Sequence, residues 1–136
     1  MLALLHLRDD YRSDGRVLVS ALESHATPRA LRRHGGTARR LGDVYEQLNA
    51  SFGEFAMQAL KASTVAIKAT DAATYDRIEN AISDLTARRV ALAPQIESEL
   101  EAAAFDGVAL DERRAQAHIG EAQALIAAAQ RLADSG

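Results

Sequence analysis

Hydrophobic side chains recur at spacings of three and four along two consecutive stretches of the chain, between Thr37 and Phe105. This spacing places them on one face of an α-helix, and such a face has to be buried. The first stretch carries Leu41, Val44, Leu48, Phe52, Phe55, Ala59, Ala62 and Ala66. The second carries Tyr75, Ile78, Ile82, Leu85, Leu92, Ile96, Leu100 and Ala103. Each face finds its nearest partner in the other helix, so the pattern predicts two long antiparallel helices joined by a turn near Thr70 and Asp71.

A third stretch with the same pattern closes the chain. Asp106-Gly107 is a typical glycine exit from the second helix, and Asp111 is a good start for a last helix that runs to about Asp134. The inner face of that helix carries Ala115, Ile119, Ala122, Leu125, Ile126, Ala129, Leu132 and Ala133. We therefore expect an all-α protein: an antiparallel bundle of three long helices, with a short N-terminal helix and an irregular N-terminal segment.

The expected helix ends follow from capping residues. Thr27-Pro28 predicts the start of a short helix, because threonine caps free amides and proline at the first helical position loses no hydrogen bond. That helix is expected to run to about His34 and to stop at Gly35-Gly36. Thr37 is then expected to cap the first long helix, and Asp71 the second.

Four residues disturb this regular pattern. Gly42 and Gly53 lie inside the first long helix and cost about 1 kcal/mol each relative to alanine. We expect them to mark the close approach of another backbone, with a kink as the alternative. Pro94 removes one backbone hydrogen bond from the second helix, which predicts a bend there. Arg89 occupies a stripe position, so its stem is expected along the edge of the core with the guanidinium group in water.

The first 36 residues are less regular. Met1–Leu7 is apolar and is either a buried strand or the end of a helix, and Asp14-Gly15 predicts a turn. Arg16–Leu22 has a β-branched character and is either a short strand or a single helical turn, but strand candidates are too few for a sheet. We therefore divide the chain into an N-terminal segment with the short helix, residues 1–36, and a helical bundle, residues 37–136, within a single domain.

Composition narrows the function. Hydrophobic residues make up 48% of the 136 residues but aromatic residues only 4%, so much of the apolar share is alanine and the core is expected to be thin. The formal charge of −3 argues against a general nucleic-acid binder. The absence of cysteine excludes disulfides and thiolate metal sites. No apolar run is long enough for a membrane span, and Leu2–Leu7 lacks the flanks of a signal peptide, which leaves the compartment open.

Candidate chemistry is sparse. The four histidines share no helical ligand spacing, and we interpret them as separate surface or core-edge side chains: His6, His25, His34 and His118. Glu97, Glu99 and Glu101 are expected to face mostly outward as a solvated face. The sequence thus predicts no catalytic residue, no metal site and no cofactor, and we expect a protein that is not an enzyme.

One local charge feature is a candidate site. Between residues 29 and 40 the chain carries five arginines and no acidic residue: Arg29, Arg32, Arg33, Arg39 and Arg40. One interpretation is a solvated corner between two helices. The alternative is docking onto an acidic partner surface, which makes these five arginines candidate partner-docking residues.

Several segments resemble a known family. MLALLHLRDDYRSDGRVL (Met1–Leu18) resembles the closing segment of the catalytic domain in the sulfatase-like phosphoesterases of the alkaline-phosphatase superfamily. Leu41–Thr64, Thr74–Gly107 and the alanine-rich last helix are similar to a helical C-terminal extension of some bacterial members. The metal ligands and the Ser or Thr nucleophile of that family lie upstream of the segment that this chain resembles. The resemblance therefore implies a helical appendage without an active site.

Together these observations favour a non-catalytic helical module with a packing or oligomerisation role, similar to the C-terminal appendage of a metal-dependent phosphoesterase. The expected partners are a second copy of the chain or the catalytic domain of the parent enzyme, and neither nucleic acid nor a membrane. The alternative is a free-standing interaction protein that self-associates through its alanine-rich stripes. An enzyme with a site in the bundle core is a third hypothesis.

Overall fold

The structure, a computed structural model, describes residues 28–135. A single-turn helix and four longer ones follow one another in this range: α1 (Arg29–Arg32), α2 (Gly35–Asn49), α3 (Glu54–Ile67), α4 (Ala72–Phe105) and α5 (Glu112–Ala133). No strand occurs among the described residues, so the all-α prediction is confirmed for them. The predictions for Met1–Leu22 and the Thr27 cap lie outside the described residues.

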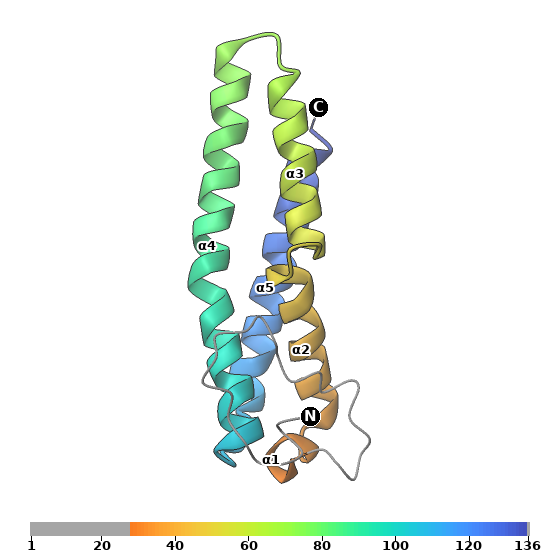
Figure 1. Cartoon of the computed structure of the whole chain (residues 1–136), viewed down its shortest axis with the longest axis vertical. Coiled ribbons are helices and arrows are strands. Elements are labelled where there is room, and N and C mark those ends of the chain that lie inside the picture. The colour runs from red at the N-terminus through yellow and green to blue at the C-terminus, as the bar shows by residue number, and fades with distance from the viewer. Residues whose placement is uncertain (1–27, 136) are drawn as a thin grey trace.

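Figure 1 shows an elongated molecule. Helices α2 and α3 follow one another along its long axis, and α4 runs beside both of them. Helix α5 lies alongside α2, α3 and α4, and the single turn of α1 sits at the end where α2 begins. The 34 residues of α4 therefore span the length that α2 and α3 cover together.

The prediction of one long helix between Thr37 and residue 66 is wrong, because the chain breaks between α2 and α3. Ala50 ends α2 in an extended conformation, and Gly53 precedes α3 with ψ near 164°. A Cβ atom on Gly53 would lie 2.6 Å from the carbonyl oxygen of Gln47, so only glycine fits beside the end of α2. Close backbone approach is confirmed at Gly53. It is wrong at Gly42, where a Cβ atom would meet nothing within 4 Å.

The aspartate caps are confirmed. The Asp71 carboxylate accepts a hydrogen bond from the backbone N–H of Thr74 at 2.8 Å, and the Asp111 carboxylate accepts one from that of Arg114 at 3.0 Å. Gly107 has φ +70° at the end of α4, where the N–H of Val108 bonds to the carbonyl of Ala102. This is the left-handed glycine exit expected from the sequence.

The expected start of the first long helix is wrong by three residues, because the N-cap is His34 instead of Thr37. Gly35 and Gly36 begin α2 instead of ending the preceding helix, and α1 ends at Arg32. Thr37 is not a cap: it is buried inside the first turn of α2, and its hydroxyl donates to the Glu112 carboxylate at 3.4 Å. The threonine therefore ties the start of α2 to the start of α5.

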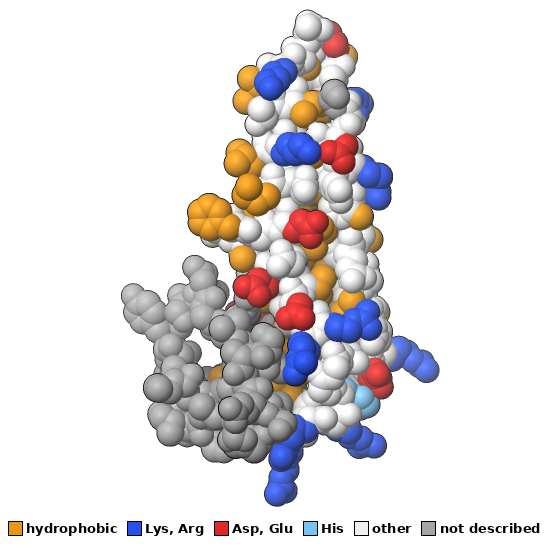
Figure 2. Space-filling model, turned by 90° about the vertical axis from the view of Figure 1, so that its right-hand side faces the viewer, with side chains coloured by type: hydrophobic (Ala, Val, Ile, Leu, Met, Phe, Trp, Pro, Cys, Tyr) orange, Lys and Arg blue, Asp and Glu red, His pale blue; other side chains and the backbone are white. Residues whose placement is uncertain are grey.

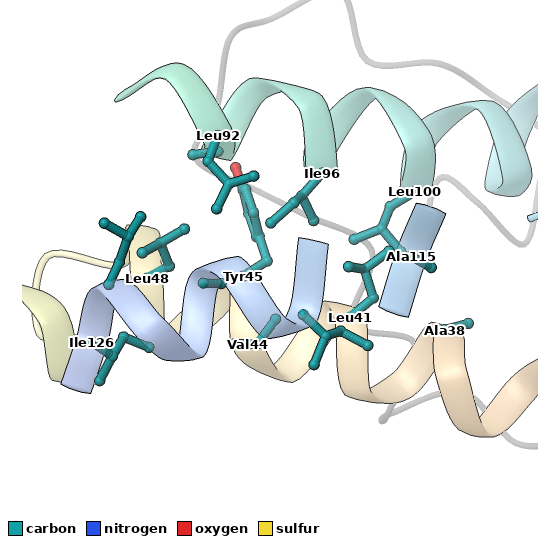
Figure 3. Packing of buried hydrophobic residues seen from close by; sticks show 14 of the residues in the cluster. Ala38, Leu41, Val44, Tyr45, Leu48, Leu92, Ile96, Leu100, Ala115 and Ile126 are labelled. Carbon is teal, nitrogen blue, oxygen red and sulfur yellow. The ribbon is translucent and has the colours of Figure 1, made fainter. Parts of the chain in front are cut away.

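Two apolar clusters form the core. The larger one gathers buried side chains of α2, α4 and α5, such as Leu41, Ile96 and Leu125, and also takes in Leu31 of α1 and Phe55 of α3. Figure 3 shows how side chains from the three helices point toward one another in this cluster. The smaller cluster holds four buried residues under the far part of α3: Ala62, Ala66, Ile78 and Ala133. The core is therefore broad at the α2 end and thin at the α3 end.

Two stripe residues are placed differently from the prediction. Phe52 lies in the link between α2 and α3 with its side chain 90% exposed, and Tyr75 is 42% exposed. The guanidinium carbon of Arg89 lies 5.7 Å from the centre of the Phe55 ring, and its Nε is buried, so this partly exposed side chain also stacks on an aromatic face at the edge of the core. Pro94 is contained within α4, which continues through it from Ala72 to Phe105.

Candidate interaction surface

The outward side of α3 carries a row of exposed apolar side chains. Met57, Leu60 and Ile67 are 50%, 65% and 76% exposed, and the exposed Thr64 completes their spacing of three, four and three residues. This is the a/d spacing of a helix-pairing seam. We call these four residues the outer stripe of α3. Phe52 adds a fourth exposed apolar side chain just before the helix.

The outer stripe exists because α3 is apolar on two sides. Its inward side buries Phe55, Ala62 and Ala66, and its 14 residues include only two charged ones, Glu54 and Lys61. Figure 2 shows hydrophobic side chains gathered along one edge of the upper half of the molecule, the half that contains α3 in Figure 1. Large exposed apolar groups that cluster in this way mark interaction sites.

The hydroxyl group of Thr64 is compatible with the apolar character of the outer stripe. It donates a hydrogen bond to the backbone carbonyl of Leu60, one turn earlier, at 3.0 Å. The polar atom is therefore satisfied within the helix. The methyl group is the part of Thr64 that a partner would meet.

Charged groups flank the outer stripe on one side. Glu54, Lys61 and Lys68 follow one another at intervals of seven residues, which keeps them on one side of the helix. Lys61 lies 3.0 Å from the carboxylate of Asp134 at the end of α5. Within residues 28–135, neither Glu54 nor Lys68 forms an ion pair.

The five candidate arginines lie at the opposite end of the molecule. All are exposed, they belong to α1, α2 and the residue between them, and none pairs with a carboxylate in the described range. Figure 2 shows Lys and Arg side chains projecting from this lower end. Close to these arginines, Nδ1 of His34 lies 3.0 Å from the carboxylate of Glu112. The structure thus separates a basic end from the apolar surface on α3.

One polar pair is buried where the sequence predicted a solvated face. Nδ1 of His118 on α5 lies 3.0 Å from Oε2 of Glu99 on α4, and both side chains are about one-tenth exposed. The second carboxylate oxygen of Glu99 is buried and has no hydrogen-bond partner in the structure. The outward placement of Glu99 was therefore wrong. The pair joins α4 to α5.

Several other features complete the survey of the described residues. A shallow groove of about 420 Å³ lies between α2 and α5 and is lined by a mixture of apolar, charged and glutamine side chains. No group of three or more acidic or histidine side chains in residues 28–135 is placed to hold a metal ion. Among the helices of that range, none combines the length and the apolar character that a membrane crossing requires.

Comparison of the chain with protein families, with curated proteins and with solved structures finds no match. The resemblance to sulfatase-like phosphoesterases therefore stays a prediction from the quoted segments. The function has to be argued from the surface itself. The predicted stripe describes only the inward face of α3, and the spacing of Met57, Leu60 and Ile67 is the signal in the sequence for the outward one.

Proposed function

We propose that this chain is a non-catalytic helical module that associates with a second copy of itself through the outer stripe of α3. The observation that carries the proposal is the exposure of Met57, Leu60 and Ile67 on one row of a helix with few charges. Removing that row from water is favourable by roughly 25 cal/mol for each Å² buried. The row is short, so we expect a weak dimer with a dissociation constant on the order of micromolar.

The scaffold that presents this surface is inferred to be an antiparallel bundle of three rods. The first rod is α2 followed by α3, the second is α4 and the third is α5. Two features support this arrangement: each core cluster draws side chains from all three rods, and the connections between rods are short. Among residues 28–135, no other helix covers the outward side of α3, where Met57, Leu60 and Ile67 are exposed.

A second copy is favoured over other occupants because the edge of the outer stripe carries both charge signs. Glu54 lies in the first turn of α3 and Lys68 directly follows its last residue. A surface with one charge of each sign at its two ends is complementary to itself. A catalytic domain of the phosphoesterase kind is the alternative occupant, suggested by the resemblance of Met1–Leu18.

The proposal is tested by solution mass across concentrations from micromolar to near-millimolar values. We expect the wild-type chain to approach twice its monomer mass and Leu60→Glu to remain monomeric, because the substitution places a charge in the centre of the contact. Val108→Glu is the matched control: Val108 is 55% exposed and lies in the loop between α4 and α5. It should dimerise like the wild type.

The outcomes separate the occupants. A wild-type chain that stays monomeric throughout the range would contradict self-association and leave the catalytic-domain alternative. Equal loss of dimer in Val108→Glu would show that any added charge disperses the copies. A Leu60→Glu chain that dimerises like the wild type would place the contact elsewhere.

The non-catalytic part of the proposal has its own test. The purified chain, incubated with a generic phosphate ester and divalent metal ions, should show no turnover above that of the metals alone. The support is the absence of a convergent set of acidic and imidazole groups among residues 28–135. Metal-dependent turnover that follows the protein through purification would overturn this part.

A further inference from the structure

We infer that the two copies pair their α3 helices antiparallel, across a two-fold axis near the middle of α3. The inference rests on the proposed self-association and adds the direction and register of the contact. It is carried by the order of side chains along the outer stripe and by the charges beside it.

The outer stripe of one copy is complementary to the outer stripe of a second copy that runs in the opposite direction. Its residues alternate between the two seam positions: Met57 and Thr64 occupy one kind, Leu60 and Ile67 the other. When two such helices run in opposite directions, each position of one kind meets one of the other kind. Met57 then faces Ile67 of the second copy, and Leu60 faces Thr64. All four residues find an apolar neighbour at the same time.

The charges beside the outer stripe favour the same direction. In the antiparallel register, Glu54 of each copy lies beside Lys68 of the other, so two opposite-charge contacts form at the two ends of the interface. In a parallel pair with the copies level, Glu54 would lie at the same height as Glu54, and Lys68 at the same height as Lys68. Like charges brought to the same height oppose that arrangement.

Lys61, the third charged residue beside the outer stripe, is compatible with the proposed two-fold axis. Lys61 sits at the centre, where the two-fold axis brings it toward Lys61 of the other copy. Its ammonium group already lies 3.0 Å from Asp134 of its own chain. The neighbouring carboxylate lowers the repulsion between the two lysines. The central pair therefore does not outweigh the two contacts at the ends.

Disulfide trapping measures the direction, because the natural chain contains no cysteine and every engineered thiol is unique. Residues 57 and 67 are ten positions apart, which is about 15 Å along a helix and too far for a disulfide bridge. In the antiparallel pair, Met57→Cys alone should not cross-link to itself. A mixture of Met57→Cys and Ile67→Cys chains, one carrying a mass tag, should give the mixed disulfide.

The results are read against Val108→Cys, which marks the level of random collision. Mixed disulfide well above that level, with little of either self-linked species, supports the inference. Self-linked Met57→Cys as the main product would overturn it in favour of a parallel pair, while the proposed function would stand. Disulfides no more frequent than with Val108→Cys, together with a constant monomer mass, would overturn both.

Charge reversal gives an independent reading of the register. Glu54→Lys should raise the dissociation constant about tenfold, since each end contact changes from attraction to repulsion. The double variant Glu54→Lys with Lys68→Glu restores opposite charges at both ends and should regain wild-type dimerisation. A double variant as weak as Glu54→Lys would show that these two residues do not meet, which contradicts the register.

Discussion

Helices α2 and α3 follow one another along the same side of the molecule but distribute their large side chains in opposite ways. In α2 the large apolar groups face inward, with Leu41 and Leu48 fully buried, and arginines face outward. In α3 two of the three buried residues are alanines, and the larger Leu60 and Ile67 face water. The large apolar side chains of α2 therefore form part of the core. Those of Leu60 and Ile67 in α3 lie on the surface instead.

This difference has an energetic consequence. Alanine buries little apolar area, so the four-residue cluster under α3 contributes less to folding than the large cluster under α2. The α3 end should therefore open locally more readily than the α2 end. Contact with a second copy would compensate for the thin core at that end.

The largest effect that separates the two helices comes from truncating a leucine in each. Leu41→Ala should lower the free energy of unfolding by about 2–5 kcal/mol, because Leu41 is fully buried and its loss leaves a cavity. Leu60→Ala should change it by about 0.5 kcal/mol or less at dilute concentration, since Leu60 is 65% exposed. Urea unfolding of both variants measures the contrast. Equal losses would show that α3 is packed from both sides within one chain.

The next effect concerns the buried pair of Glu99 and His118, which joins α4 to α5. His118→Ala should destabilise the fold by roughly 3 kcal/mol, because it leaves the Glu99 carboxylate buried without its partner. The double variant Glu99→Leu with His118→Leu should recover most of that loss, since it leaves no polar group buried without a partner. A double variant less stable than His118→Ala would show that the pair stabilises the contact of α4 with α5 in a way apolar packing cannot replace.

A smaller effect is expected at the basic end of the molecule, on the binding of an acidic partner. If the five arginines dock onto an acidic partner, the chain should bind polyglutamate, and added salt should weaken the binding. Replacing Arg32 and Arg33 together by glutamine should weaken it about fivefold. The same replacement of Arg88 and Arg131, which are exposed elsewhere, is the control. Equal losses from both pairs, or binding unaffected by salt, would favour the solvated corner.

The smallest effect belongs to the cap of α4. The backbone N–H of Thr74 donates to the Asp71 carboxylate and holds the pKa of that group below its usual value. The cap therefore stabilises the fold above the unfolded-state pKa, and this contribution is lost as the pH falls through the folded-state pKa. Asp71→Ala should lower Tm slightly at neutral pH and not at acidic pH. Asp84 is exposed in the middle of α4, and Asp84→Ala should lower Tm at neither pH.

Local signals predicted the start of α4, the end of α4 and the start of α5, but not the helix ends before them. Asp71, Asp111 and Gly107 act through contacts with neighbours in the sequence, so the sequence alone identifies them. The break before α3 escaped prediction because the spacing from Leu48 through Phe52 to Phe55 stays helical across it. What decides the break is the fit of Gly53 against the end of α2, a contact that spacing does not report.

The sequence pattern indicates the burial of Glu99 and His118 but not their pairing. Glu99 lies three residues after Ile96, and His118 lies three residues after Ala115, so both occupy positions of the buried faces. The neighbouring Glu97 and Glu101 made the segment resemble a solvated face. Which acidic residue turns inward depends on a histidine of another helix, and that pairing is visible only in three dimensions.

Hydrogen exchange of the α3 and α2 backbone amides, followed as a function of protein concentration, tests the central claim most directly. If a second copy covers the outer stripe, protection in α3 should rise with concentration, because association opposes local opening at that end, while protection in α2 should change far less. Protection in α3 that stays constant up to near-millimolar concentration would contradict the claim that the outer stripe of α3 binds a second copy of the chain.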